Sequence, residues 1–292
     1  MENCQSEARR IRVRSIALIF IALFFFLFIG PIAAQLIIPK HSASLALYLK
    51  MHIPYIFLFL TFIIGTRLIL KRSLTAIIAP GRKIKGMLIA IPAFTYLLFV
   101  SLCSLILPTE IHPSHVGAGE FLSSILPVLI LTTIQSISEE ILFRALPFHV
   151  AYPEGRNGKI AEGIPFMLFS GIIFTVPHLW NTEVINSQNF LLPVLCYFSW
   201  GALAAFLSLA TGGFEATSAM HAVNNLYIAL VVNYQNSSMP VKALFIAQEA
   251  GDVETLLQTW TIFVLTYILL WHLGLTGKGG LKWPKEERKQ AK

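Results

Sequence analysis

Apolar stretches of the length that crosses a membrane recur along the chain, and they constrain its fold more than any other feature. The hydrocarbon core of a bilayer requires about 20 residues of helix, and backbone groups inside lipid must bond within their own segment. We therefore predict an all-α, polytopic membrane helical bundle with eight spanning helices. Their predicted bounds are 15–38, 45–70, 86–107, 121–151, 164–180, 190–210, 214–234 and 259–275.

The composition favours a single integral membrane domain over residues 1–292. Hydrophobic residues make up 55% of the chain and charged residues 13%, whereas a soluble domain carries about 25% charged residues. The three cysteines, Cys4, Cys103 and Cys196, are odd in number and widely spaced, so they indicate neither a disulfide framework nor a zinc finger. The first apolar stretch lacks a clear small-residue cleavage site, and we expect a spanning helix there.

Lysine and arginine residues predict the orientation, because cytoplasmic loops are enriched in them. The N-terminal tail carries four, the loop after the second span six, the loop after the fourth span two and the C-terminal tail six, against three on the opposite side. Both termini are therefore predicted to lie in the cytoplasm. Short loops favour a bacterial inner membrane, with membrane lipids as neighbours. Because the basic residues are interpreted as setting membrane orientation, no nucleic-acid partner is expected. The cytoplasmic set includes Arg9, Arg14, Arg67, Arg82, Lys83, Arg156, Lys159 and Lys278, and the opposite set is Lys40, Lys50 and Lys242.

Charged residues interrupt the fourth apolar stretch at Glu139, Glu140 and Arg144. Each costs roughly 2.5–3.5 kcal/mol at the centre of a membrane helix, so such residues indicate a functional site. Glu140 and Arg144 have the spacing of an ion pair on one helix face, and Glu139 shares a face with Gln135 instead. The alternative is a structural charge cluster that binds helices together.

Two further apolar stretches carry polar residues at a similar depth. His178 ends the fifth span, and His221 and Asn225 lie one turn apart on the seventh. Helical rise places Glu139 roughly 18 Å, His178 roughly 21 Å and the other two roughly 11 and 17 Å from the cytoplasmic ends of their spans. One site at a common depth is therefore expected, although each residue taken alone could be an ordinary contact between membrane helices.

These side chains suit hydrolysis. A carboxylate in a low-dielectric cavity becomes a better general base, and a histidine and an amide N–H can stabilise the oxyanion of a tetrahedral intermediate. Alternatively, Glu139, His178 and His221 supply the ligands of a catalytic zinc ion with an open position. The residues alone leave these two possibilities open.

The polar residues form three short motifs that resemble those of one known family. The motifs are E-E-x-x-x-R at Glu139, Glu140 and Arg144, F-x-x-x-H at Phe174 and His178, and H-x-x-x-N at His221 and Asn225. In this order they resemble the CPBP family, the CAAX proteases and bacteriocin-processing enzymes, also called the Abi family. The resemblance covers residues 121–234, which would form the catalytic core.

The resemblance implies an eight-helix intramembrane endopeptidase whose cavity opens to the cytosol. By motif position, Glu139 and His178 would activate a water, and His221 and Asn225 would stabilise the oxyanion. The substrate would be a peptide or a lipid-tethered protein tail. Residues that support the site would be Glu140, Arg144 and Phe174.

Members of the family are described both as metalloproteases and as metal-independent glutamate proteases. We favour the second type, because an asparagine is better explained as an oxyanion donor than as a metal ligand. No cofactor is then expected, and zinc is the alternative. Two other functions fit the same residues, namely a non-catalytic immunity or scaffold protein and a transporter with a buried proton relay. The absence of internal repeats disfavours the transporter.

Overall fold

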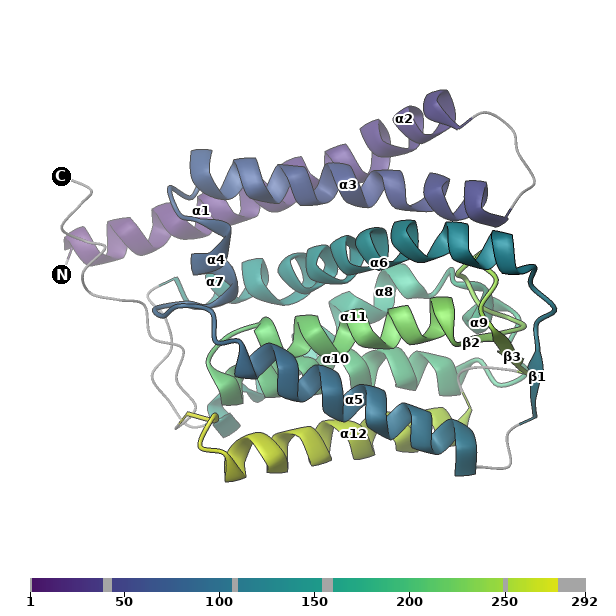
Figure 1. Cartoon of the computed structure of the whole chain (residues 1–292). Coiled ribbons are helices and arrows are strands. Elements are labelled where there is room, and N and C mark those ends of the chain that lie inside the picture. The colour runs from purple at the N-terminus through teal and green to yellow at the C-terminus, as the bar shows by residue number, and fades with distance from the viewer. Residues whose placement is uncertain (1, 39–43, 107–109, 154–159, 249–251, 278–292) are drawn as a thin grey trace.

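The computed structural model describes residues 2–38, 44–106, 110–153, 160–248 and 252–277. Long helices lie side by side and nearly antiparallel in an all-α bundle, as predicted (Figure 1). The long helical segments are α1 with η1 and α2 (Glu2–Phe24, Phe25–Ile29, Gly30–Ile37), α3 (Ser44–Leu68), α5 (Met87–Ile106), α6 with η2 and α7 (Ala118–Glu140, Ile141–Ala145, Leu146–Ala151), α8 (Ile164–His178), α10 (Leu191–Thr211), α11 (Glu215–Leu230) and α12 (Val253–His272).

Each of the eight predicted spans falls on one of these segments. Among the described residues, six segments are long and apolar enough to cross a membrane, which makes this an integral membrane protein. The other two are α8, an apolar helix of 15 residues, and α11, which has 16 residues and several polar side chains. The exact number of crossings, eight, therefore stays a prediction.

The helix ends differ from the predicted bounds where polar residues extend or end a helix. The first helix begins at Glu2 instead of residue 15, so its arginines are helical. The last begins at Val253 instead of residue 259, where the Asp252 side chain accepts a hydrogen bond from the Thr255 N–H at 2.7 Å. The seventh ends at Leu230 instead of residue 234, because a strand follows it. Hydropathy marks the apolar part of a helix and not its capped ends.

Shorter elements gather at the two ends of the bundle (Figure 1). One end, here called the sheet end, holds α9 and a three-stranded sheet of order β1-β3-β2, with β1 antiparallel and β2 parallel to β3. The opposite end, here called the basic end, holds α4 and α7, the start of α1 and the end of α12. The short elements are α4 (Leu74–Ile78), η3 (Ile160–Gly163), α9 (Thr182–Ile185), β1 (Ile111–Pro113), β2 (Val232–Tyr234) and β3 (Phe245–Ala247).

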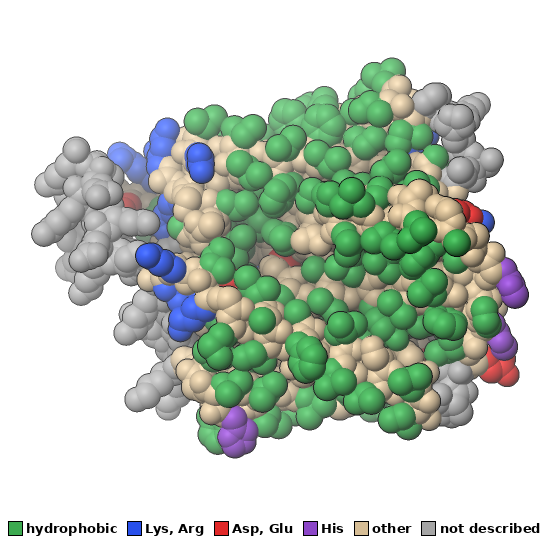
Figure 2. Space-filling view, viewed as in Figure 1, with side chains coloured by type: hydrophobic (Ala, Val, Ile, Leu, Met, Phe, Trp, Pro, Cys, Tyr) green, Lys and Arg blue, Asp and Glu red, His purple; other side chains and the backbone are tan. Residues whose placement is uncertain are grey.

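Most of the visible lysine and arginine side chains lie at the basic end (Figure 2). Acidic and histidine side chains are visible at the sheet end, and one further histidine lies toward the basic end. An apolar belt covers the face between the two ends. At the basic end Arg82, from the connection between α4 and α5, donates to both carboxylate oxygens of Glu215 on α11, at 2.9 Å for the longer contact. Basic residues that lie outside the described residues are Lys40, Arg156, Lys159 and those of 278–292.

Two buried apolar clusters meet at the middle of the bundle. One joins α1, α3, α4, η2 and α7 to parts of α8 and α10, and the other joins α5, α8, α10, α11 and α12. Phe143, one turn after Glu139, packs against both. Gly171 of α8 and Gly201 of α10 bring these two helices into backbone contact, since a Cβ on Gly201 would lie 2.8 Å from the Gly171 Cα. The end of α8 is therefore held firmly against α10.

Candidate active site

The paired glutamates end α6, and a π-helical turn, η2, follows them directly. Such turns widen a helix by one residue and are frequent at functional sites. Glu139, Glu140 and Arg144 are all buried, with at most 3% of each residue exposed. Arg144 donates from Nη1 to Glu140 Oε1, the pair that the sequence spacing predicts. Its guanidinium carbon also lies 4.6 Å above the centre of the Phe174 ring.

Glu140 makes a second contact that the sequence did not predict. Its Oε1 also accepts a hydrogen bond from Nδ1 of His221 on α11, at 2.9 Å. These residues are 81 positions apart, so no spacing within one helix could signal the contact. Glu140 therefore ties Arg144 on its own helix to a predicted catalytic histidine on another.

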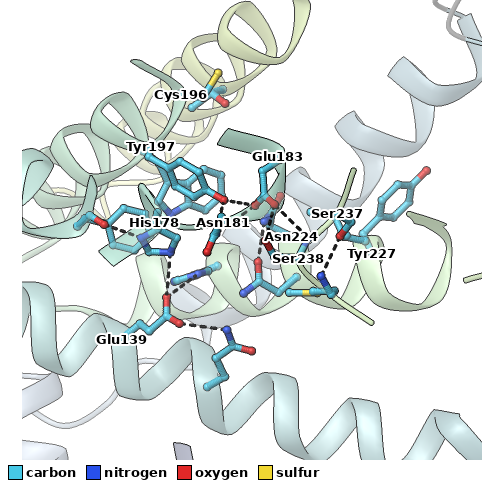
Figure 3. Close-up of a pocket in the computed structure, with 18 of the residues that line it drawn as sticks. Glu139, His178, Asn181, Glu183, Cys196, Tyr197, Asn224, Tyr227, Ser237 and Ser238 are labelled. Atoms are coloured by element: carbon cyan, nitrogen blue, oxygen red, sulfur yellow. Dashed lines mark hydrogen bonds and ion pairs between the residues drawn. The ribbon is translucent and has the colours of Figure 1, made fainter. Parts of the chain in front are cut away.

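Glu139 lies close to both histidines, and Figure 3 shows its carboxylate pointing toward His178. Its Oε2 is 3.9 Å from Nε2 of His178 and 3.6 Å from Nε2 of His221. Its Oε1 accepts from Gln135 Nε2 at 3.1 Å, as the shared helix face predicts. Residues from α6, α8 and α11 thus meet at one point.

Hydrogen bonds at Nδ1 fix which nitrogen of each imidazole faces Glu139. Nδ1 of His178 donates to the Phe174 carbonyl at 2.5 Å, and Nδ1 of His221 donates to Glu140. A neutral imidazole carries one N–H, so in the neutral state both Nε2 atoms present lone pairs toward Glu139. The distances from Glu139 Oε2 to the two Nε2 atoms are longer than a direct hydrogen bond. They suit groups that are bridged by a water molecule.

Asn225 is oriented by a chain of hydrogen bonds from outside the predicted motifs. Its Oδ1 accepts from Asn224 Nδ2 at 2.8 Å, and Asn224 Oδ1 accepts from the Tyr96 hydroxyl on α5 at 2.6 Å. Its own amide Nδ2 points toward α6 and donates to Ser136 Oγ at 3.3 Å. The polarity of the chain directs an amide N–H of Asn225, and not its carbonyl, toward α6.

His178 is clamped between two aromatic rings. Its ring centre lies 4.4 Å from that of Phe174 and 4.3 Å from that of Tyr197 on α10. The Tyr197 hydroxyl donates to Glu183 of α9, which also accepts from Asn181 Nδ2 at 3.1 Å. Glu183 lies in a connection that hydropathy did not mark as special, so sequence reasoning missed it.

All four predicted catalytic residues line one cavity of about 310 Å³. Phe174 lines it too, as predicted, whereas Glu140 and Arg144 lie behind its wall. Polar lining residues that the sequence did not single out include Asn181, Glu183, Tyr197, Asn224, Ser237 and Ser238 (Figure 3).

The donor set bears on the zinc alternative. Glu139, His178 and His221 are of the right chemical types, and the Nδ1 bonds of both histidines resemble the support that metal ligands receive. Within the described ranges, however, no group of three or more His, Cys, Asp or Glu side chains is arranged to hold a metal ion. In this arrangement the three side chains do not form a zinc site.

Fold and site together define a class, a polytopic membrane protein with a Glu–His–His centre inside the helix bundle. Residues 121–227 match the family described as type II CAAX prenyl endopeptidase Rce1-like, which is a protease family. The match confirms the predicted resemblance to CAAX-type membrane proteases over that segment.

A curated relative was also found. The chain is 28% identical over 197 residues to the uncharacterized protein YyaK of Bacillus subtilis (strain 168). The alignment covers 65% of this chain and 62% of YyaK, so the chain spans less than two thirds of that relative's length. No solved structure matches the chain significantly.

Proposed function

We propose that the protein is an intramembrane endopeptidase that activates water with a glutamate. The observation that carries the proposal is the position of Glu139 Oε2, 3.9 and 3.6 Å from two Nε2 atoms whose rings are fixed at Nδ1. Neither contact is a direct hydrogen bond, and a water placed between Glu139 Oε2 and Nε2 of His178 would meet two acceptors for its hydrogens. A structural charge cluster would not need this spacing.

The first step would be the attack of that water on the peptide carbonyl. Glu139 takes a proton from the water as the oxygen bonds to the carbonyl carbon, and His178 accepts the water's other hydrogen as a hydrogen bond. When the carbon–nitrogen bond breaks, the proton held by Glu139 passes to the departing amine nitrogen. One water is consumed, and a new carboxyl end and amino end are formed.

The oxyanion would be stabilised by His221 and Asn225. His221 can donate from Nε2 only when that atom is protonated, because Nδ1 already donates to Glu140. Glu140 accepts from Nδ1 and so holds the ring with Nε2 turned toward the cavity. Asn225 carries two amide hydrogens, and one of them donates to Ser136.

The substrate would be a peptide or a lipid-tethered protein tail. The cavity wall combines polar groups with apolar side chains from several helices, which suits an extended chain bearing apolar residues. A multi-pass protein of a bacterial inner membrane, surrounded by lipid and without a nucleic-acid partner, remains our proposal for its setting. Apolar lining residues include Met51, Leu58, Val100, Trp200 and Ile262.

The decisive test is cleavage of a fluorogenic peptide library by protein purified in detergent. We expect Glu139→Gln to lower kcat about 1000-fold. Glu120→Gln is the matched control, since Glu120 lies on the same helix but is exposed and pairs with Lys242. The control should retain wild-type cleavage.

A strong chelator separates the two mechanisms within the same assay. Cleavage that survives chelation but is lost in Glu139→Gln supports water activation by glutamate. Cleavage lost to the chelator and restored by zinc would replace this mechanism with a metal site at Glu139, His178 and His221. An immunity or scaffold role would follow if Glu139→Gln kept full biological activity.

A further inference from the structure

The cavity lies toward one end of the bundle. Helices α8, α10, α11 and α12 line it only with the half nearest the sheet end, through residues 174–178, 193–200, 221–228 and 255–262. Glu139, Leu142 and Phe143 of α6 and η2 mark its inner limit. The catalytic residues therefore lie at the bottom of a space that extends toward the sheet.

Every lining residue that lies outside a long helix comes from the sheet end. These residues belong to α9, the segment before it, β2 and the connection that follows β2; they are Asn181, Glu183, Tyr234, Ser237, Ser238 and Met239. None of the described connections at the basic end, residues 69–86, 152–153, 160–163 and 212–214, contributes to the lining.

Packing closes the opposite direction. Between the catalytic carboxylates and the basic end, the side chains of Arg144, Leu146 and Phe148 are completely buried. Phe214, 1% exposed, packs its ring 6.1 Å from that of Phe148. A peptide could reach Glu139 from the basic end only by displacing this core.

Charge distinguishes the two ends in the membrane. Around α4, the chain at the basic end carries Arg67, Lys71, Arg82 and Lys83. In and beside β1, the chain at the sheet end carries Glu110, His112, His115 and Glu120, of which Glu120 pairs with Lys242. Cytoplasmic loops are enriched in lysine and arginine. The basic end is therefore the cytoplasmic one, and the cavity lies on the other side of the catalytic residues.

We infer that the site takes its substrate from the extracytoplasmic side. The substrate class is then an exported peptide or the outer-face tail of a membrane protein, not a cytosolic tail. This inference rests on the proposed function for its substrate, and it reverses the cytosolic opening that the family resemblance implies. The polar groups of Asn181, Ser237 and Ser238 would be the first that such a chain meets.

Thiol labelling tests the direction without requiring activity. In a variant whose cysteines are all replaced (Cys4→Ser, Cys103→Ser, Cys196→Ser), one cysteine is introduced into the cavity by Ser237→Cys. Lys83→Cys marks the basic end and Asn189→Cys, an exposed position between α9 and α10, marks the sheet end. A membrane-impermeant maleimide is added to spheroplasts and, separately, to inverted membrane vesicles.

We expect Ser237→Cys and Asn189→Cys to react in spheroplasts and Lys83→Cys to react only in inverted vesicles. Labelling of Ser237→Cys from inverted vesicles, from both sides, or from neither side while Asn189→Cys reacts in spheroplasts would overturn the inference. These outcomes do not depend on cleavage, so a failure here is distinct from a failure of the protease proposal.

A second arm tests the substrate side. Protein is reconstituted into liposomes, and the molecules whose sheet end faces outward are counted by labelling of Asn189→Cys. A cleavable, membrane-impermeant peptide added outside should be cut at a rate proportional to that outward fraction. A rate that instead follows the fraction with Lys83→Cys outward would contradict an extracytoplasmic substrate.

Discussion

At the scale of single residues, Glu140 makes one contact within its own sequence motif and a second contact to another motif. It accepts from both Arg144 and His221, so it fixes the ring that presents Nε2 to the cavity. We expect Glu140→Gln to lower kcat on the order of 100-fold with little change in KM, as measured by peptide cleavage. Glu215→Gln is the matched control, because Glu215 is another buried glutamate paired with an arginine but lies away from the cavity. An equal loss of kcat in both variants would reduce Glu140 to a structural role.

The Tyr96 hydroxyl is a second residue-scale determinant, since it begins the chain that orients Asn225. Without that hydroxyl the Asn224 amide is free to rotate, and the Asn225 N–H is held less well. We expect Tyr96→Phe to lower kcat about 10-fold at unchanged thermal stability, as measured by kinetics and a melting curve. Tyr227→Phe, which removes a hydroxyl that bonds to Ser104 at 2.9 Å instead, should keep wild-type kcat. If the two variants behave alike, the chain does not orient the amide.

At the scale of elements, the contact of α8 with α10 positions His178. A Cβ on Gly201 would meet the Gly171 Cα at 2.8 Å and the Phe174 Cβ at 2.9 Å, so α8 must move away. We expect Gly201→Ala to lower Tm by about 5 °C and to lower kcat as well, because Phe174 stacks on His178. Gly119→Ala, at a position with open space, should change neither. Wild-type kcat in Gly201→Ala would show that the packing of α8 against α10 does not determine the position of His178.

At the scale of the whole molecule, α11 depends on its neighbours. It carries Glu215, His221, Asn224 and Asn225 within 16 residues, and charged or polar residues oppose insertion of a single helix. We expect residues 215–230, tested alone in a glycosylation-mapped insertion assay, to insert in less than about half of the molecules. The segment 191–211 of α10, apolar and long enough to span, should insert in most. Efficient insertion of α11 alone would show that its polar residues need no partners.

Patterns within single helices were predictable from the sequence. The lengths of the apolar stretches predicted where the long helices lie, because the bilayer thickness sets the length of a spanning helix independently of its neighbours. Helical periodicity placed the Glu140–Arg144 pair and the Gln135–Glu139 hydrogen bond, since residues one turn apart must be neighbours. The common depth of Glu139, His178 and His221 correctly predicted that these three side chains meet. The catalytic roles assigned to these residues stay predictions.

Contacts between helices were decided only by the tertiary structure. The bond from His221 to Glu140, the chain from Tyr96 to Asn225 and the clamp of Tyr197 on His178 join residues with no periodic relation in the chain. The sequence also did not predict the end of the bundle toward which the cavity extends. That direction depends on which halves of α8, α10, α11 and α12 leave space between them. The sequence by itself determined a membrane bundle and the depth of its polar groups, through hydropathy and helical geometry. Packing alone decided which atoms meet, because that depends on how the helices rotate and approach one another.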